Sequence, residues 1–189
     1  MNEQMQTFLK GQFLIAMPVL SDPIFYQTVT CISEHTLQGA VGLIVNRTHP
    51  SLTAKDIFDE LKIEHGSGMG SIPIHIGGPV HIDEIFVLHG PPFDWEGSFA
   101  ITPSLSLSNT RDILAAIAIG QGPSSFIITL GCAGWAPGQL ESEIKENAWL
   151  TCNAFEEIIF EIPAEIKWEA ATKKMGIDPS KLSDIAGHA

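Results

Sequence analysis

Basic residues are scarce in this sequence. Its 189 residues include ten lysines and arginines against 22 aspartates and glutamates, which gives a formal net charge of −12 at pH 7. Nucleic-acid backbones are bound mainly through Lys and Arg, and the densest basic cluster here is the pair Lys173-Lys174. The composition therefore argues against direct binding to nucleic acid.

Cysteines and long apolar runs are also few. Cys31, Cys132 and Cys152 are odd in number and far apart, which suits a reducing compartment better than a disulfide framework. No stretch reaches the roughly 18 apolar residues of a membrane-spanning helix. The short run Phe13–Met17 lacks the basic region that precedes the apolar part of a signal peptide. We therefore expect a cytoplasmic protein that does not enter a membrane.

Motifs of familiar catalytic and cofactor sites are missing. The sequence contains no GxGxxG or GxxxxGK[ST] spacing for nucleotides and no GxSxG nucleophile elbow. It also has no CxxC pair for a thiolate zinc site. No catalytic residue, metal or cofactor is predicted on this basis.

The apolar content, by contrast, is ample for a core. Hydrophobic residues make up 44% of the chain and charged residues 17%, as in a globular domain. The length predicts a single domain over residues 1–189. Short apolar runs predict strands at Phe13–Met17, Thr28–Ser33, Ala40–Val45, Ile72–Ile76, Glu84–Leu88, Phe99–Thr102 and Ser125–Leu130.

Helical patterns are predicted between and after these strands. Thr53 is placed to cap the first helix, whose apolar residues recur at helical spacing up to Leu61. The others begin near Ser108 or Asn109, at Pro137 or Gly138, and near Pro163, the last ending at Gly176. This mixture predicts an α/β or α+β domain with a mixed sheet, in which a loop-rich part forms an inserted lobe.

Several motifs follow one another in an informative order. They are GQFLIAMP (Gly11–Pro18), GAVGLIVNR (Gly39–Arg47), GGPV (Gly77–Val80), LGCAGWAPGQLESEI (Leu130–Ile144), AWL (Ala148–Leu150) and a terminal GHA (Gly187–Ala189). Each is weak alone, but as an ordered set they make the sequence resemble the bacterial AlgH/YqgE family over almost its whole length. The resemblance implies an α+β fold with a mixed, partly barrel-like β-sheet flanked by helices. It also implies a small inserted βαβ-type lobe, which we place around residues 50–105.

The same resemblance implies a bacterial cytoplasmic protein and no particular biochemical activity. Members of the family are often labelled transcriptional regulators. Any site must therefore be sought among the residues themselves.

The stretch Leu130–Leu150 is the first candidate for a functional surface. Trp135 follows a glycine-rich turn, where it either fills the core or presents a stacking surface, and both interpretations stay open. Gln139 and Glu143 lie four residues apart on one helix face. They either pair with each other, face solvent or bind something polar.

Histidines at two predicted strand ends are the second candidate. His35 follows Glu34, and His89 follows the strand that ends at Leu88. If the two strands are neighbours, Glu34, His35 and His89 supply the donors of a metal or acid–base site. The plainer interpretation is that the histidines form hydrogen bonds that fix strand ends. His75 is interpreted as a surface residue.

Asn46 and Arg47 follow the apolar strand Ala40–Val45 and are the third candidate. Asn46 suits a turn, or lines a pocket at the end of the strand. Only Arg47 and Arg111 are arginines, so an anion site would use Arg47.

These observations favour a non-catalytic cytoplasmic binding or regulatory module, whose partner is a protein or a small ligand. One alternative is a small-molecule-binding protein or enzyme with a Trp/Gln/Asn/His surface site. A second is a transcriptional regulator that acts through a protein partner. We hypothesise that Gly131–Glu143 forms one wall of a site, with Asn46 and His35 opposite. The full candidate set is Trp135, Gln139, Glu143, Asn46, Arg47, His35 and His89.

Overall fold

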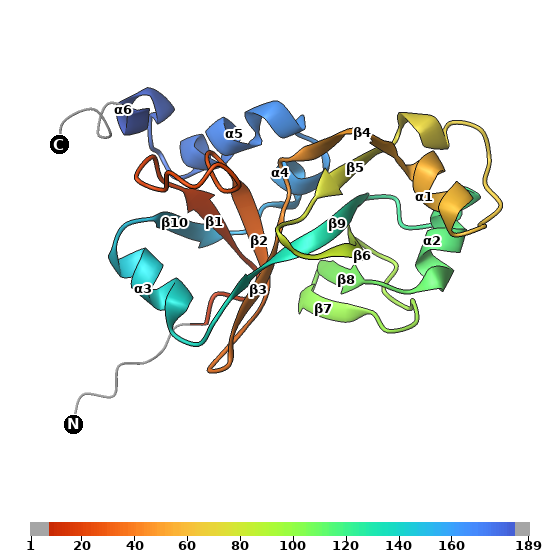
Figure 1. Ribbon diagram of the computed structural model, residues 1–189, viewed down its shortest axis with the longest axis horizontal. Coiled ribbons are helices and arrows are strands. Elements are labelled where there is room, and N and C mark those ends of the chain that lie inside the picture. Colours follow the sequence, from red (N-terminus) through yellow and green to blue (C-terminus); the bar gives the residue numbers. More distant parts are fainter. Residues whose placement is uncertain (1–7, 184–189) are drawn as a thin grey trace.

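Ten strands and six α-helices make up residues 8–183, the part of the chain that the computed structural model describes (Figure 1). The strands are β1 (Gln12–Ala16), β2 (Val29–Thr36), β3 (Gly39–Ile44), β4 (Thr48–Thr53), β5 (Pro73–Ile76), β6 (Val80–His89), β7 (Phe99–Thr102), β8 (Leu105–Ser108), β9 (Phe126–Trp135) and β10 (Trp149–Asn153). The α-helices are α1 (Ala54–Glu60), α2 (Arg111–Ala118), α3 (Gln139–Lys145), α4 (Glu156–Phe160), α5 (Lys167–Lys174) and α6 (Pro179–Ser183). Two short 3-10 turns, η1 (Met69–Ser71) and η2 (Ala164–Ile166), complete the described chain.

All the strands belong to one mixed sheet. Its main path runs β10-β1-β2-β3-β9-β6-β8-β7, and β4 and β5 join beside β9. β5 pairs with β9 in parallel, whereas the other pairs are antiparallel. The end strands β10 and β7 do not pair with each other within residues 8–183, so the sheet is open. The α+β fold with a mixed, helix-flanked sheet is thus confirmed.

Strand β9 joins two halves of the sheet, one made of β10, β1, β2 and β3 and the other of β4–β8. Its last residues pair with β3, and its first residues pair with β5 and β6. Figure 1 shows it crossing from the side of α3 to the side of α2. A fully buried run of three residues, Ile127–Thr129, lies where the strand is covered on both faces.

Buried side chains form three clusters around this strand. One lies under α4 and α5 and includes Phe13 and Trp168. A second lies between α1 and α2 and includes Phe58 and Ile113. The third lies beneath α3 and includes Trp135. The helices therefore hold the sheet by their apolar faces, as the helical spacing of these residues predicts.

Glycines of two motifs meet where the chain crosses itself. A Cβ on Gly77 would lie 2.2 Å from the carbonyl oxygen of Gly131, and one on Gly78 would lie 2.3 Å from the carbonyl carbon of Cys132. Only glycine allows two backbones to approach this closely. The GGPV and LGCAGW motifs thus serve backbone packing at this crossing.

Capping residues and apolar patterns in the sequence predicted most helices and strands. Elements without such patterns were not predicted. Thr53 begins α1 with a capping box that it shares with Asp56. Strands β4, β8 and β10 and helices α4 and α6 were not predicted. An inserted lobe around residues 50–105 stays a prediction, and the terminal GHA motif lies outside the described residues.

Candidate functional site

Trp135 fills the core and does not present a stacking surface. Its side chain is buried, with 6% of the residue exposed, and it packs against Trp149 and Phe25. Its indole N–H donates to Glu143 Oε2 at 2.9 Å, and the indole of Trp149 donates to the same oxygen at 2.8 Å. Gln139 Nε2 donates to Glu143 Oε1 at 2.9 Å. Trp135, Gln139 and Glu143 are thus brought together as a hydrogen-bonded unit.

His35 lies next to the same helix but is also occupied by the protein. Its Nε2 is 3.1 Å from Oε1 of Glu141 in α3, and its Nδ1 accepts from the backbone N–H of Leu9 at 3.1 Å. The exposed ring of Phe8 packs edge-on against it. These contacts tie the first described residues to α3, so His35 is a connecting residue between two segments.

His89 is not near His35. Strands β3 and β9 separate β2 from β6, so the condition for an approach of the two histidines is not met. His89 is fully buried, with Nε2 2.9 Å from Ser108 Oγ and Nδ1 2.8 Å from the Gly90 carbonyl oxygen. Burial lowers its pKa. It fixes the ends of β6 and β8, and the described residues contain no group of three metal-ligating side chains.

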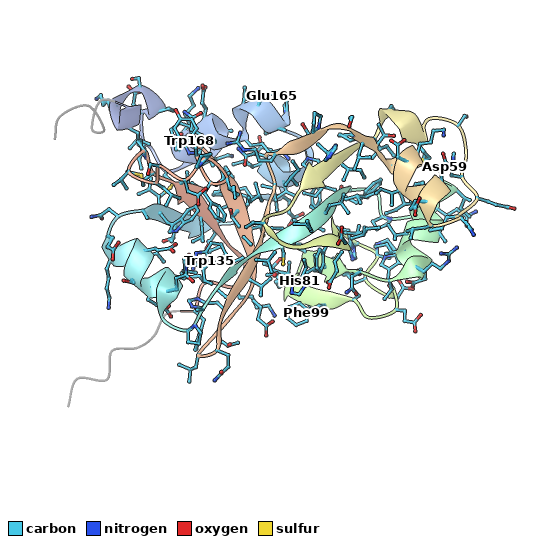
Figure 2. All side chains as sticks on the ribbon, in the orientation of Figure 1. Asp59, His81, Phe99, Trp135, Glu165 and Trp168 are labelled. Atoms are coloured by element: carbon cyan, nitrogen blue, oxygen red, sulfur yellow. The ribbon has the colours of Figure 1, made fainter. Side chains whose placement is uncertain are left out.

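Asn46 and Arg47 lie in a different place from Trp135. They line a polar pocket of about 90 Å³ together with Trp168 and Glu165, and no residue of Gly131–Glu143 is part of its lining. Figure 2 labels Trp168 and Glu165 near α5, and Trp135 near α3. Asn46 is held by the backbone, because Oδ1 accepts from Val29 N at 2.8 Å and Nδ2 donates to a carbonyl oxygen at 2.9 Å. Neither these hydrogen bonds nor the pocket brings Asn46 into contact with Gly131–Glu143, so a site shared by the two stays a prediction.

A larger cleft lies between the α4–α5 connection and the β4–β5 pair. Its volume is about 460 Å³, within the range of pockets that bind small molecules. We call it the Lys167 cleft. It is lined by residues 159–165 and Lys167, by Thr48, Ile72, Pro73 and His75, and by Phe126 and Ile127.

Lys167 brings a buried positive charge to this cleft. The residue is 2% exposed, and Nζ donates to the carbonyl oxygens of Val45 at 2.9 Å and Ile159 at 2.6 Å. Within residues 8–183, no carboxylate lies within 4 Å of Nζ. Burial lowers the pKa of Lys167 to about 8, and the charge of Glu165 opposes that change. A buried ammonium without a directly contacting carboxylate is costly, so it marks the cleft as a candidate site.

His75 lies in the wall of the same cleft and is buried, with 6% exposed. Burial, with repulsion from Lys167, lowers its pKa to about 4, although a hydrogen bond with the backbone of Ile128 acts in the opposite direction. Its Nδ1 has no hydrogen-bond partner among the described residues, and neither does Oγ1 of Thr129, its register partner in β9. Buried polar atoms are rarely left unpaired in this way. The interpretation of His75 as a surface residue is wrong.

The sequence held little sign of this cleft. Lys167 begins a charged helical segment, KWEAATKK, which is typical of a solvated surface helix. Its burial depends on Val45, which is 122 residues away in the chain. Only the position of His75 beside Ile74 in a short apolar strand hinted at burial.

Comparison with known proteins gives consistent matches. The family model described as AlgH-like matches residues 13–180. A UPF0301 protein of Desulforapulum autotrophicum is 51% identical over 189 residues, which cover 100% of both chains. A UPF0301 protein of Nitrosospira multiformis is 47% identical over 96% of this chain and 97% of its own.

Solved structures with the same fold include the solution structure of the AlgH protein from Pseudomonas aeruginosa. It is 42% identical, covers 100% of both chains and has a TM-score of 0.81. A protein from Corynebacterium diphtheriae has a TM-score of 0.71 at 19% identity, with 96% of this chain and 93% of that one covered. The second match shows the fold alone.

Proposed function

The chain belongs to the AlgH-like family, and starting from that membership we propose that it is a non-catalytic, cytoplasmic binding module whose small ligand occupies the Lys167 cleft. The observation that carries the proposal is the buried ammonium of Lys167, which has no carboxylate within 4 Å among the described residues and borders a cleft of about 460 Å³. A charge in such a place is stabilised most simply by a ligand.

The cleft can select a ligand by both shape and polarity. Its walls are mostly apolar, with Phe126, Phe160 and Ile162 among them. Its polar and charged lining residues are Thr48, His75, Glu161, Glu165 and Lys167. A few polar groups within apolar walls are typical of small-molecule sites.

A regulatory role follows from where the cleft lies. One wall belongs to the segment before α5, which packs with the β1–β3 half, and the other wall belongs to β5 and β9. A ligand that contacts both walls favours one relative position of these segments over others. We infer that ligand binding changes the surface presented to a protein partner.

The cytoplasmic setting is supported by three free cysteines, Cys31, Cys132 and Cys152. No helix in the described part of the chain has the length and apolar character needed to cross a membrane.

The proposal is tested by mapping amide chemical shifts during a screen of small molecules. We expect a ligand to perturb residues 159–167 and His75 together, and to raise the melting temperature as it stabilises the folded state. Perturbations confined to the surface of α3, with the cleft unchanged, would contradict the proposal.

An enzyme at the same cleft is the alternative, because a buried lysine and a buried neutral histidine also occur in active sites. Recovery of the bound molecule separates the two functions. A binding module returns its ligand unchanged after long incubation, whereas an enzyme converts it.

A further inference from the structure

Two of the three N–H groups of the Lys167 ammonium are used by the protein. They donate to the carbonyl oxygens of Val45 and Ile159, and no third acceptor is present among residues 8–183. Both acceptors are neutral, so these bonds orient the ammonium without neutralising its charge. An acceptor that also carries negative charge would complete the arrangement.

The position of Lys167 in its helix adds to the local positive potential. It is the first residue of α5, whose N-cap is Ile166. The N-terminal end of a helix carries a partial positive charge and favours anions. Helix and ammonium thus act in the same direction at this end of the cleft.

The rim of the cleft opposes a second negative charge. Glu161 and Glu165 are exposed and line it, and the whole chain carries a formal charge of −12. A phosphate or dicarboxylate would bring additional charge close to these carboxylates. The charges therefore select an anion with a single charge.

The remaining walls of the cleft favour an apolar body. Phe126, Ile127, Phe160 and Ile162 supply aromatic and branched aliphatic surface. His75 also lines the cleft, and its unpartnered Nδ1 is a buried atom of this wall. The ligand consequently needs an apolar part that is larger than its polar head.

We propose that the ligand of the Lys167 cleft is a small monocarboxylate with an apolar body, whose carboxylate accepts the third N–H of Lys167. This inference rests on the proposed function and names the chemical class of its ligand. The apolar body lies against the phenylalanines and isoleucines, and the two exposed glutamates exclude acids of higher charge.

The test compares three probes that differ only in the head group: 4-phenylbutyrate, 4-phenylbutanol and 4-phenylbutylamine. Binding to the full-length protein is measured at pH 7 by titration calorimetry and by amide shifts of residues 159–167. The acid is expected to bind at least about tenfold more tightly than the alcohol, as for a hydrogen bond between charged groups. The amine is expected to bind most weakly.

The substitution Lys167→Met keeps the apolar stem and removes the charge. It should bring the acid down to the affinity of the alcohol, while the alcohol itself binds as before. Lys173→Met is the matched control, because Lys173 is exposed and contacts Glu169 outside the cleft. This control should preserve the preference for the acid.

A pH series on the unaltered protein keeps the test decisive if Lys167→Met does not fold. The titratable groups that border the cleft with Lys167 are His75, Glu161 and Glu165. The pKa of His75 lies near 4, so this side chain stays neutral from pH 7 to 10. Affinity for the acid should therefore fall as the pH rises above about 8, where Lys167 loses its proton, and affinity for the alcohol should stay constant.

The outcomes test the class of ligand and the proposed binding function separately. Equal affinity for acid and alcohol, or tightest binding of the amine, overturns the carboxylate and leaves the cleft as a binding site. Failure of all three probes to shift the cleft amides at 10 mM, roughly the weakest binding worth calling specific, overturns the proposed function as well.

Discussion

Trp135 donates its indole N–H to Oε2 of Glu143 at a distance of 2.9 Å, from the end of β9 to the middle of α3. Because the same oxygen accepts the indole of Trp149 at 2.8 Å, one carboxylate satisfies the polar atoms of two buried aromatic side chains. The helix is thereby fixed to the sheet by its acidic side chain as well as by its apolar face.

Replacing Glu143 should therefore destabilise the fold. Glu143→Ala leaves two buried indole N–H groups without partners, and each costs about 1–3 kcal/mol. We expect the free energy of unfolding in urea to fall by roughly 2–6 kcal/mol. The control is Glu146→Ala, since that exposed carboxylate accepts, among residues 8–183, a single hydrogen bond from Ser142 Oγ at 3.2 Å. Equal losses for both variants would show that the indole bonds contribute nothing.

The close contact between the backbones of Gly78 and Cys132 predicts that any larger residue at position 78 destabilises the fold. Gly78→Ala adds a Cβ where the nearest atom, in the backbone of Cys132, lies 2.3 Å away, and it places alanine at a φ of +151°. We expect a loss of about 2–5 kcal/mol in the free energy of unfolding, from strain and overpacking together. Gly70→Ala, with no atom within 4 Å of the added Cβ, should remain close to wild type. Comparable melting temperatures for the two variants would refute the crossing as the reason for this glycine.

The buried histidine of the cleft predicts acid sensitivity. Folding lowers the pKa of His75 from 6.5 to about 4, so between these values the unfolded chain binds more protons than the folded one. Stability is therefore complete above pH 6.5 and is lost as the pH falls towards 4. Between pH 6.5 and 4, His75→Leu should lose about 3 kcal/mol less stability than wild type. Parallel curves of unfolding free energy against pH would contradict this.

The cysteines should differ in their reactivity. Burial raises the pKa of Cys31 to about 12, whereas Cys152 is only partly buried. Because the thiolate is the reactive form, Cys152 should be alkylated before Cys31 in the native protein. Peptide mass mapping over time gives the order. After denaturation without reductant, three alkylated thiols are expected, and a remaining pair of unmodified cysteines would indicate a disulfide.

Elements with local signals could be predicted from the sequence. The helix after Thr53 has both a capping residue and an apolar face, and it begins where these features place it. Strand β4 contains Pro50 and has no buried residue, so it carries neither alternation nor an apolar run. It is a strand only because β5 pairs with it. Tertiary pairing determines such segments, and a single sequence does not reveal the pairing.

The candidate site was predictable only in part, for the same reason. The spacing of Gln139 and Glu143 predicted a shared helix face and left open whether they pair, which the structure shows that they do. Lys167 is surrounded by Val45, which is far away in the sequence, and by Ile159 of α4, a helix that was not predicted. Its immediate neighbours Ile166 and Trp168 are apolar, but the charged residues Glu165 and Glu169 flank them, so the local sequence does not show which of these side chains is buried. Burial of a charge is a property of the assembled fold.

The central position of β9 also affects the order in which the strands can pair during translation. Three partner strands, β3, β5 and β6, are translated before residues 126–135 exist to pair with them. A nascent chain that has reached residue 125 therefore exposes strand edges and apolar side chains that have no cover. We expect β1–β2–β3 and β6–β8–β7 to form separate pairings at this stage, and the complete sheet to form only after residues 126–135 leave the ribosome.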